Sequence, residues 1–179
     1  MKKATREYLA YVAKRLGNVP FHGSVDGLVS NLEPIVESFP TWSVEEADGL
    51  WCAGFVYLCC READFGIPYR PTGCKTCHLA ACLGWEEFAL NDPRIEYWRG
   101  AEGFLPEPGD IVIYDRVFEN KAHDHMGIVL KNREHTIIVA EGNVNNYSCV
   151  IERPVDEHIR AYIRIPDGYR YSAGDAGTL

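Results

Sequence analysis

Residues 51–60 read WCAGFVYLCC, a stretch that is apolar on nearly every side of a helix. Such a pattern is typical of a helix buried at the centre of a fold, because a surface helix carries polar residues along one face. Cys52 stands at the start of this stretch, where unpaired backbone N–H groups and the helix dipole favour negative charge. A thiol in that position ionises more readily. We therefore take Cys52 as a candidate nucleophile and expect Cys59 and Cys60, farther along the helix, to be core residues.

The flanking segments, up to residue 93, predict further helices. Apolar residues recur at helical spacing from Tyr8 to Leu16 and stop at Gly17. A second helix is predicted over residues 25–38. Ser43 is expected to cap a short helical element at residues 44–46, and a later helix is predicted over residues 77–90.

After residue 108 the pattern changes to short β-branched or apolar runs that polar turns separate. The predicted strands cover residues 111–114, 126–130, 136–140, 149–152 and 159–165. Because the connections between them are short, we expect an antiparallel sheet. Helices followed by a sheet predict an α+β fold, and 179 residues are enough for one domain with a substantial core.

The composition excludes several classes of function. The net charge of −8 and the pI of about 5.2 argue against binding to nucleic acid or to anionic lipid. Apolar runs are too short to span a membrane, and the charged start of the chain does not resemble a signal peptide. We therefore expect a cytoplasmic protein, or one delivered by a route that needs no signal peptide. The seven cysteines are expected to be reduced thiols.

Two later motifs carry polar groups that can serve a thiol nucleophile. Residues 124–129 read DHMGIV and residues 141–143 read EGN. An imidazole can accept the thiol proton, and a carboxylate or amide can hold the ring in the required tautomer. Alternation along two neighbouring strands would place His125 and Glu141 on facing positions, since 141 − 125 = 16 residues suffice for two short strands and a turn.

Five motifs in this order resemble the cysteine, histidine-dependent amidohydrolase/peptidase (CHAP) family, a branch of the NlpC-type, papain-like hydrolases. They are WCAGFV at 51–56, PGDIV at 108–112, DHMGIV at 124–129, EGN at 141–143 and IRAYIRI at 159–165. The resemblance implies a papain-like domain over residues 43–171, with residues 1–42 as a helical segment packed on it and residues 172–179 as a flexible tail. It implies Cys52 as nucleophile, His125 as general base and then acid, Glu141 as the group that orients His125, and Asn143 as a supporting polar group.

Some assignments stay open at this level. The sequence context favours His125 over His123 as the base, while Asn143 shares with Glu141 the claim to orient the imidazole. We expect the backbone N–H of Cys52 to stabilise the oxyanion, with Trp51 or a residue near Ser43 as the second donor. Residues 74–78 read CKTCH, a spacing that also suits haem attachment, a redox pair or, with Cys82, a zinc site. We interpret that segment instead as a loop that packs its thiols inward.

The resemblance implies an enzyme that hydrolyses an amide bond, commonly in peptidoglycan and in some relatives in glutathionylspermidine. The expected partner is thus a peptide or peptidoglycan-type amide, with no cofactor and no metal; the oligomeric state is not predicted. One alternative is a cytosolic amidase that acts on a small γ-glutamyl or peptide amide. A second is a non-catalytic thiol or metal-binding module built on Cys74 to Cys82.

Overall fold

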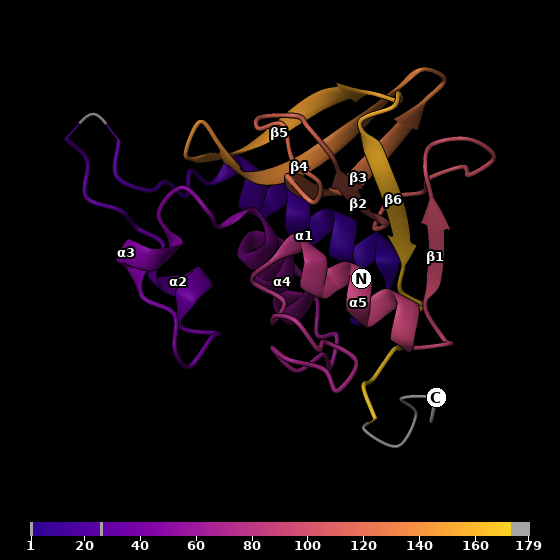
Figure 1. The fold of residues 1–179 in the computed structure, drawn as a ribbon, viewed down its shortest axis with the longest axis horizontal. Helices are drawn as coiled ribbons and strands as arrows, with labels where there is room; N and C mark the ends of the chain where they lie inside the picture. The colour runs from indigo at the N-terminus through magenta and orange to yellow at the C-terminus, as the bar shows by residue number, and fades with distance from the viewer. Residues whose placement is uncertain (1, 26, 173–179) are drawn as a thin grey trace.

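A computed structural model describes residues 2–25 and 27–172 of the chain. Six strands form one sheet in the order β1-β6-β2-β3-β4-β5, and every neighbouring pair is antiparallel (Figure 1). The strands are β1 (Glu96–Arg99), β2 (Ile111–Tyr114), β3 (His125–Arg133), β4 (Thr136–Val144), β5 (Tyr147–Pro154) and β6 (Ile159–Arg164). Their arrangement confirms the α+β class and the antiparallel sheet expected of a small papain-like domain.

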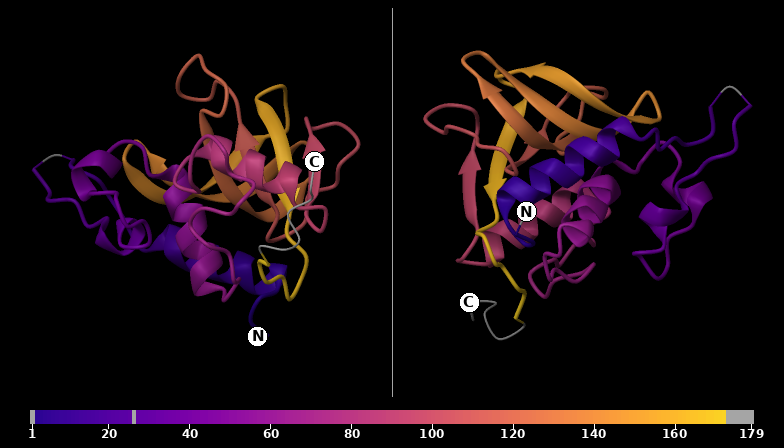
Figure 2. Two further views of the ribbon diagram at one scale, coloured as in Figure 1. Left: turned by 60° about the horizontal axis from the view of Figure 1, so that its bottom comes forward. Right: turned by 180° about the vertical axis from the view of Figure 1, so that it is seen from behind.

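Helices cover one face of this sheet. They are α1 (Arg6–Asn18), α4 (Cys52–Glu62) and α5 (Cys82–Asn91). The short helices α2 (Glu33–Val36) and α3 (Val44–Ala47) lie to the side, where α2 packs on α4 and α3 packs on α2 (Figure 1). Helix α1 lies across strands β3, β4 and β5 and also contacts α4, as Figure 2 shows from behind. Every residue of α4 from Cys52 to Cys60 is buried, as its all-round apolar pattern predicted. No helix in residues 2–25 and 27–172 combines the length and hydropathy that a bilayer span requires.

Alternation along the strands gives the sheet two apolar faces. Ile111, Ile113 and Ile128 belong to the larger cluster that the helices complete. Val112 and Tyr114 face the other way and join a smaller cluster under the loops. Because Tyr114 pairs directly with His125, the first residue of β3 lies on this second face, where it contacts Cys52 at the start of α4.

The helix predicted over residues 25–38 is wrong except for about one turn near its end. The chain makes an irregular arm there, with an isolated bridge between Val25 and Leu28 and a positive φ of 81° at Gly27, and only α2 is helical. In the first half of this range the apolar side chains are not buried: Leu28 is 52% exposed and Val29 is 88% exposed, whereas Ile35 and Val36 of α2 are core residues. Apolar spacing without burial supplies no packing energy to hold a helix.

Two smaller expectations also change. Helix α5 begins at Cys82 rather than residue 77, and the exposed edge strand β1 was not predicted. In contrast, Ser43 caps α3 as expected: its side chain accepts the Glu46 N–H, and the Glu46 carboxylate accepts the Ser43 N–H. The predicted flexible tail falls almost entirely on residues 173–179, which lie outside the described residues.

Candidate active site

Cys52 is the first residue of α4 and lines a cavity of about 570 Å³. The first hydrogen bond of the helix runs from the Phe55 N–H to the Trp51 carbonyl, over 2.9 Å. The backbone N–H groups of Cys52 and Ala53 therefore precede the helical ladder, and that of Ala53 contacts the thiol. This arrangement matches the expectation that the helix start favours a thiolate.

His125 and Glu141 meet across β3 and β4, as the alternation predicted. Gly127 pairs with Glu141, so the His125 side chain lies two residues farther along on the same face. The His125 Nε2 lies 2.9 Å from Glu141 Oε2, and both side chains are buried, at 1% and 0% exposure. Since Nε2 is held by the carboxylate, Nδ1 is left for the Cys52 thiol, which His125 also contacts.

A third charged group, Arg153 on β5, completes the row. Its guanidinium donates two hydrogen bonds to the Glu141 carboxylate, from Nε to Oε1 over 3.0 Å and from Nη2 to Oε2 over 2.6 Å. Burial works against the charged form of Glu141, but His125 and Arg153 hold the pKa of its carboxyl below the usual value. The carboxylate therefore stays ionised inside the protein, with both oxygens in hydrogen bonds.

These contacts set the charges of the thiol and the imidazole. Burial opposes protonation of His125, but the Cys52 thiolate and the Glu141 carboxylate outweigh it and raise the pKa of His125 to about 9. A hydrogen bond from Cys82 lowers the pKa of Cys52 well below its usual value; burial opposes this, and His125 adds to it. At neutral pH the site therefore holds a thiolate and an imidazolium, the reactive form of such a pair.

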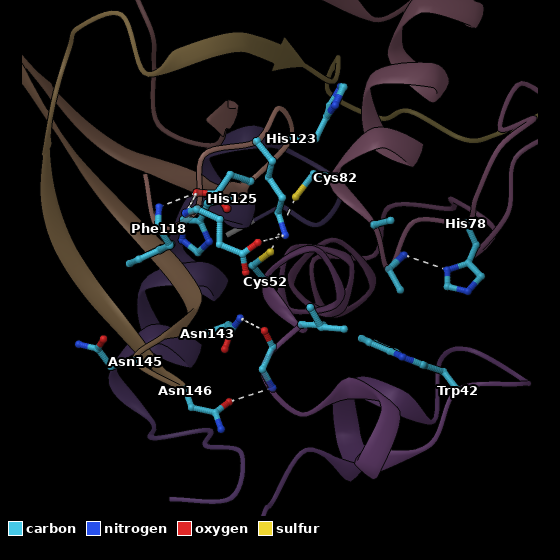
Figure 3. Close-up of a pocket in the computed structure, with 17 residues that line it drawn as sticks. Trp42, Cys52, His78, Cys82, Phe118, His123, His125, Asn143, Asn145 and Asn146 are labelled. Atoms are coloured by element: carbon cyan, nitrogen blue, oxygen red, sulfur yellow. Dashed lines mark hydrogen bonds and ion pairs between the residues drawn. The ribbon is translucent and has the colours of Figure 1, made fainter. Parts of the chain in front are cut away.

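Cys82 is a member of the site that the sequence reading missed. Its Sγ lies 3.7 Å from the Cys52 Sγ, and Figure 3 shows the two sulfurs beside His125. The Cys52 thiolate raises the pKa of Cys82 well above its usual value, and burial adds to this, so Cys82 stays a protonated donor. In the sequence Cys82 stood out only as part of a predicted helix and as a possible zinc ligand with Cys74, Cys77 and His78, and neither pattern showed that α5 begins beside the start of α4.

Asn143 does not contact His125 but holds the segment that leads into α4. Its Nδ2 donates to the Gly49 carbonyl over 2.7 Å. Asn146, in the next turn, accepts the Trp51 indole N–H over 2.8 Å and donates to the Asp48 carboxylate over 2.6 Å. Of the two candidates, the structure thus places Glu141, not Asn143, against the imidazole. Asn143 and Asn146 instead hold residues 48–51, the segment that precedes Cys52, through hydrogen bonds.

The loop between β2 and β3 forms another wall of the cavity. Asp124 accepts the backbone N–H groups of Phe118 and Glu119. This brings the Phe118 ring edge-on to His125, with 4.9 Å between ring centroids. His123, the histidine that the sequence context disfavours as the base, also lines the cavity. Its ring is hydrogen-bonded to the Glu86 carboxylate, which also accepts a hydrogen bond from Arg160.

The side chains of the CKTCH segment and Cys82 do not converge on one point; they have separate partners. Cys74 donates to the Gly84 carbonyl, His78 Nδ1 accepts the Ala80 N–H, and Cys82 faces Cys52. Within residues 2–25 and 27–172, no group of three or more His, Cys, Asp and Glu side chains could hold a metal ion. Cys59 and Cys60 are buried core thiols, as predicted.

The expected oxyanion donors are partly revised. The Cys52 backbone N–H remains at the cavity. Trp51 and Ser43 do not line it, whereas Trp42, the residue beside Ser43, does. The Trp51 indole is bonded to Asn146, and the Ser43 side chain caps α3. Arg153 and Phe118 are further residues that sequence reasoning missed, although Arg153 continues the alternation of the predicted strand at 149–152.

Comparison with known proteins agrees with this geometry. The family model of the CHAP domain matches residues 44–143. No curated protein matches the chain. The match spans every residue of the Cys52, His125 and Glu141 row and more than half of the 179 residues. The chain therefore belongs to the CHAP domain family, the cysteine, histidine-dependent amidohydrolases and peptidases.

Proposed function

We propose that this protein hydrolyses a peptide amide bond of peptidoglycan, with Cys52 as nucleophile and His125 as general acid and base. The observation that carries the proposal is the continuous row from Cys52 through His125 and Glu141 to Arg153, at the wall of a cavity large enough for a peptide. Each member stabilises the charge of the next, and of the four only Cys52 and His125 line the cavity.

The acylation half-reaction follows from the charges at the site. The Cys52 thiolate attacks the amide carbonyl carbon, and the carbonyl oxygen becomes an oxyanion close to the Cys52 N–H. When the C–N bond breaks, the leaving nitrogen takes the proton of the His125 imidazolium. A thioester and a free amine result, and His125 becomes neutral.

Deacylation restores the starting charges. Neutral His125 takes a proton from a water molecule, whose oxygen attacks the thioester carbon. The C–S bond then breaks, which releases a carboxylic acid and returns the thiolate beside the imidazolium. Throughout, Glu141 holds Nε2 of the ring and thereby keeps Nδ1 directed at the thiol.

The cavity walls support a peptide substrate. Amide side chains of Asn143 and Asn145 can hydrogen-bond a peptide backbone, and Trp42 and Leu50 offer apolar contact. We take these features as support for the substrate class and leave the particular bond to experiment.

The test is digestion of purified peptidoglycan and of small γ-glutamyl amides, with new amino termini and new reducing ends assayed separately. We expect new amino termini from peptidoglycan with the wild type and with Cys77→Ser, a matched control outside the cavity. Cys52→Ser and His125→Ala should release none. Cleavage of the γ-glutamyl amides alone would replace peptidoglycan by a small substrate, and equal cleavage by Cys52→Ser would overturn the mechanism.

A further inference from the structure

We propose that Cys82 is a resolving thiol: when a hydroperoxide oxidises Cys52, Cys82 captures the oxidised sulfur as a reversible disulfide that switches the site off. The inactivation that we infer rests on the proposed function, because it assumes that Cys52 is the nucleophile. The disulfide itself rests on the placement of the two thiols.

The placement brings together two residues that lie 82 − 52 = 30 positions apart. Cys52 opens α4 and Cys82 opens α5, so each thiol sits on the first residue of a rigid element. Their sulfurs are 3.7 Å apart, and a disulfide bond of about 2.05 Å needs them to approach by about 1.7 Å. Side-chain rotation at two helix starts can supply part of that movement without displacing either helix axis.

The cavity gives an oxidant access to this pair and to no other thiol pair. Among the described residues that line the cavity, Cys52 and Cys82 are the only cysteines. Cys59 and Cys60, on the same helix as Cys52, are buried away from it at 0% exposure. A hydroperoxide that enters the substrate cavity therefore meets the reactive thiolate with its neighbour already in contact.

The chemistry balances with the groups at hand. The Cys52 thiolate attacks one peroxide oxygen, the O–O bond breaks, and the leaving oxygen takes the proton of the His125 imidazolium to form water. Cys52 is then a sulfenic acid. The Cys82 sulfur attacks the Cys52 sulfur, and the hydroxyl group leaves as water with the Cys82 proton. Overall, two thiols and one hydrogen peroxide give a disulfide and two waters.

The charges of the two thiols suit these two roles. Cys82 and His125 lower the pKa of Cys52, so this thiol is the one that reacts first. Cys82 stays protonated while its neighbour is a thiolate and becomes easier to ionise once that negative charge is gone. Without a resolving thiol, further peroxide would carry Cys52 to the sulfinic acid, which simple thiols do not reduce.

The test treats the full-length protein with hydrogen peroxide and follows Cys52 by mass spectrometry of an unreduced digest and by iodoacetamide labelling. For the wild type and the Cys77→Ser control, we expect the Cys52 and Cys82 peptides joined and lighter by two hydrogens. Labelling of Cys52 should be lost and then fully restored by dithiothreitol. In Cys82→Ser, which retains a hydrogen-bond donor, labelling should be lost without recovery and Cys52 should carry two added oxygens.

The proposal is overturned if the wild-type digest contains no joined peptide, or if dithiothreitol restores Cys82→Ser as fully as the wild type. The first measurement needs no variant, so a folding failure of Cys82→Ser leaves the proposal testable. Neither readout depends on amide hydrolysis. If the Cys52 and Cys82 peptides are found joined but the protein cleaves no amide, only the proposed function is refuted. If the protein cleaves an amide but the peptides are never joined, only the proposed switch is refuted.

Discussion

Glu141→Gln should lower the pKa of His125 while leaving the ring in place. Glutamine keeps the shape and one oxygen of the side chain but removes the negative charge that lies 2.9 Å from Nε2. The imidazolium is present below its pKa of about 9 and is lost as the pH rises through that value. A neutral partner stabilises the imidazolium less, so the loss should begin at lower pH.

The size of the change follows from the contact. A hydrogen bond to a charged group contributes about 1.5–3 kcal/mol. At 1.36 kcal/mol for each pH unit, the loss of most of that contribution moves the pKa of His125 from about 9 to between about 7 and 8. Because the thiolate and the imidazolium share a proton, the measured value belongs to the pair.

Arg153 supplies an internal check on the sign. In Glu141→Gln its guanidinium is left without a carboxylate and repels the imidazolium. In Glu141→Gln with Arg153→Met both charges are gone. The pKa of His125 should therefore rank wild type above the double variant, and the double variant above Glu141→Gln. The double variant also removes the partly buried charge that Glu141→Gln leaves without its carboxylate and that would destabilise the single variant.

NMR titration of ¹³C-labelled histidine measures this directly and needs no substrate. The His125 signal is assigned by its absence in His125→Ala, and Glu152→Gln, on the exposed part of β5, is the matched control. A folded Glu141→Gln protein with the wild-type pKa at His125 would refute the view that the carboxylate stabilises the imidazolium.

Three further outcomes test other parts of the structure. Iodoacetamide at about pH 6 should label Cys52 before the other six cysteines, because burial or, for Cys82, the neighbouring thiolate raises their pKa values; mass spectrometry identifies the labelled site. Ser43→Ala should lower the free energy of unfolding in urea by about 1 kcal/mol through loss of the α3 cap, and no change would show that the cap is unimportant. Gly142→Ala should lower the free energy of unfolding by about 1–3 kcal/mol in the same assay and slow the labelling of Cys52, because the added Cβ would lie 2.5 Å from the Phe55 side chain. Unchanged stability would show that α4 can shift away from β4 at little cost.

The core of the site could be read from the sequence because each part has a local signal. An all-round apolar run fixed α4 and placed Cys52 at its first residue. Strict alternation placed His125 and Glu141 on one face of adjacent strands, and the pairing of Gly127 with Glu141 brings them into contact.

The unpredicted parts depend on packing between segments far apart in the chain. The Cys52–Cys82 contact arises from how α5 meets α4, and the Arg153–Glu141 contact from how β5 pairs with β4. No local pattern encodes either distance. The helix expected at residues 25–38 fails in its first half for the complementary reason, since Leu28 and Val29 have no surface to bury against.

The proposed nucleophile, Cys52, and the proposed base, His125, belong to different layers. The site therefore depends on the contact between the start of α4 and the end of β4, which we call the seam. A register irregularity between Glu141 and Val144 breaks the regular pairing of β4 with β5 at that seam. Asn143, within it, has a φ of 63° and reaches the Gly49 carbonyl, while Glu141, two residues earlier, still faces His125. Gly142 between them has no side chain, which lets Phe55 and the Trp51 ring approach the strand. Three consecutive residues thus divide the work at the seam: Glu141 holds the imidazole, Gly142 lets α4 pack closely, and Asn143 holds the segment before Cys52.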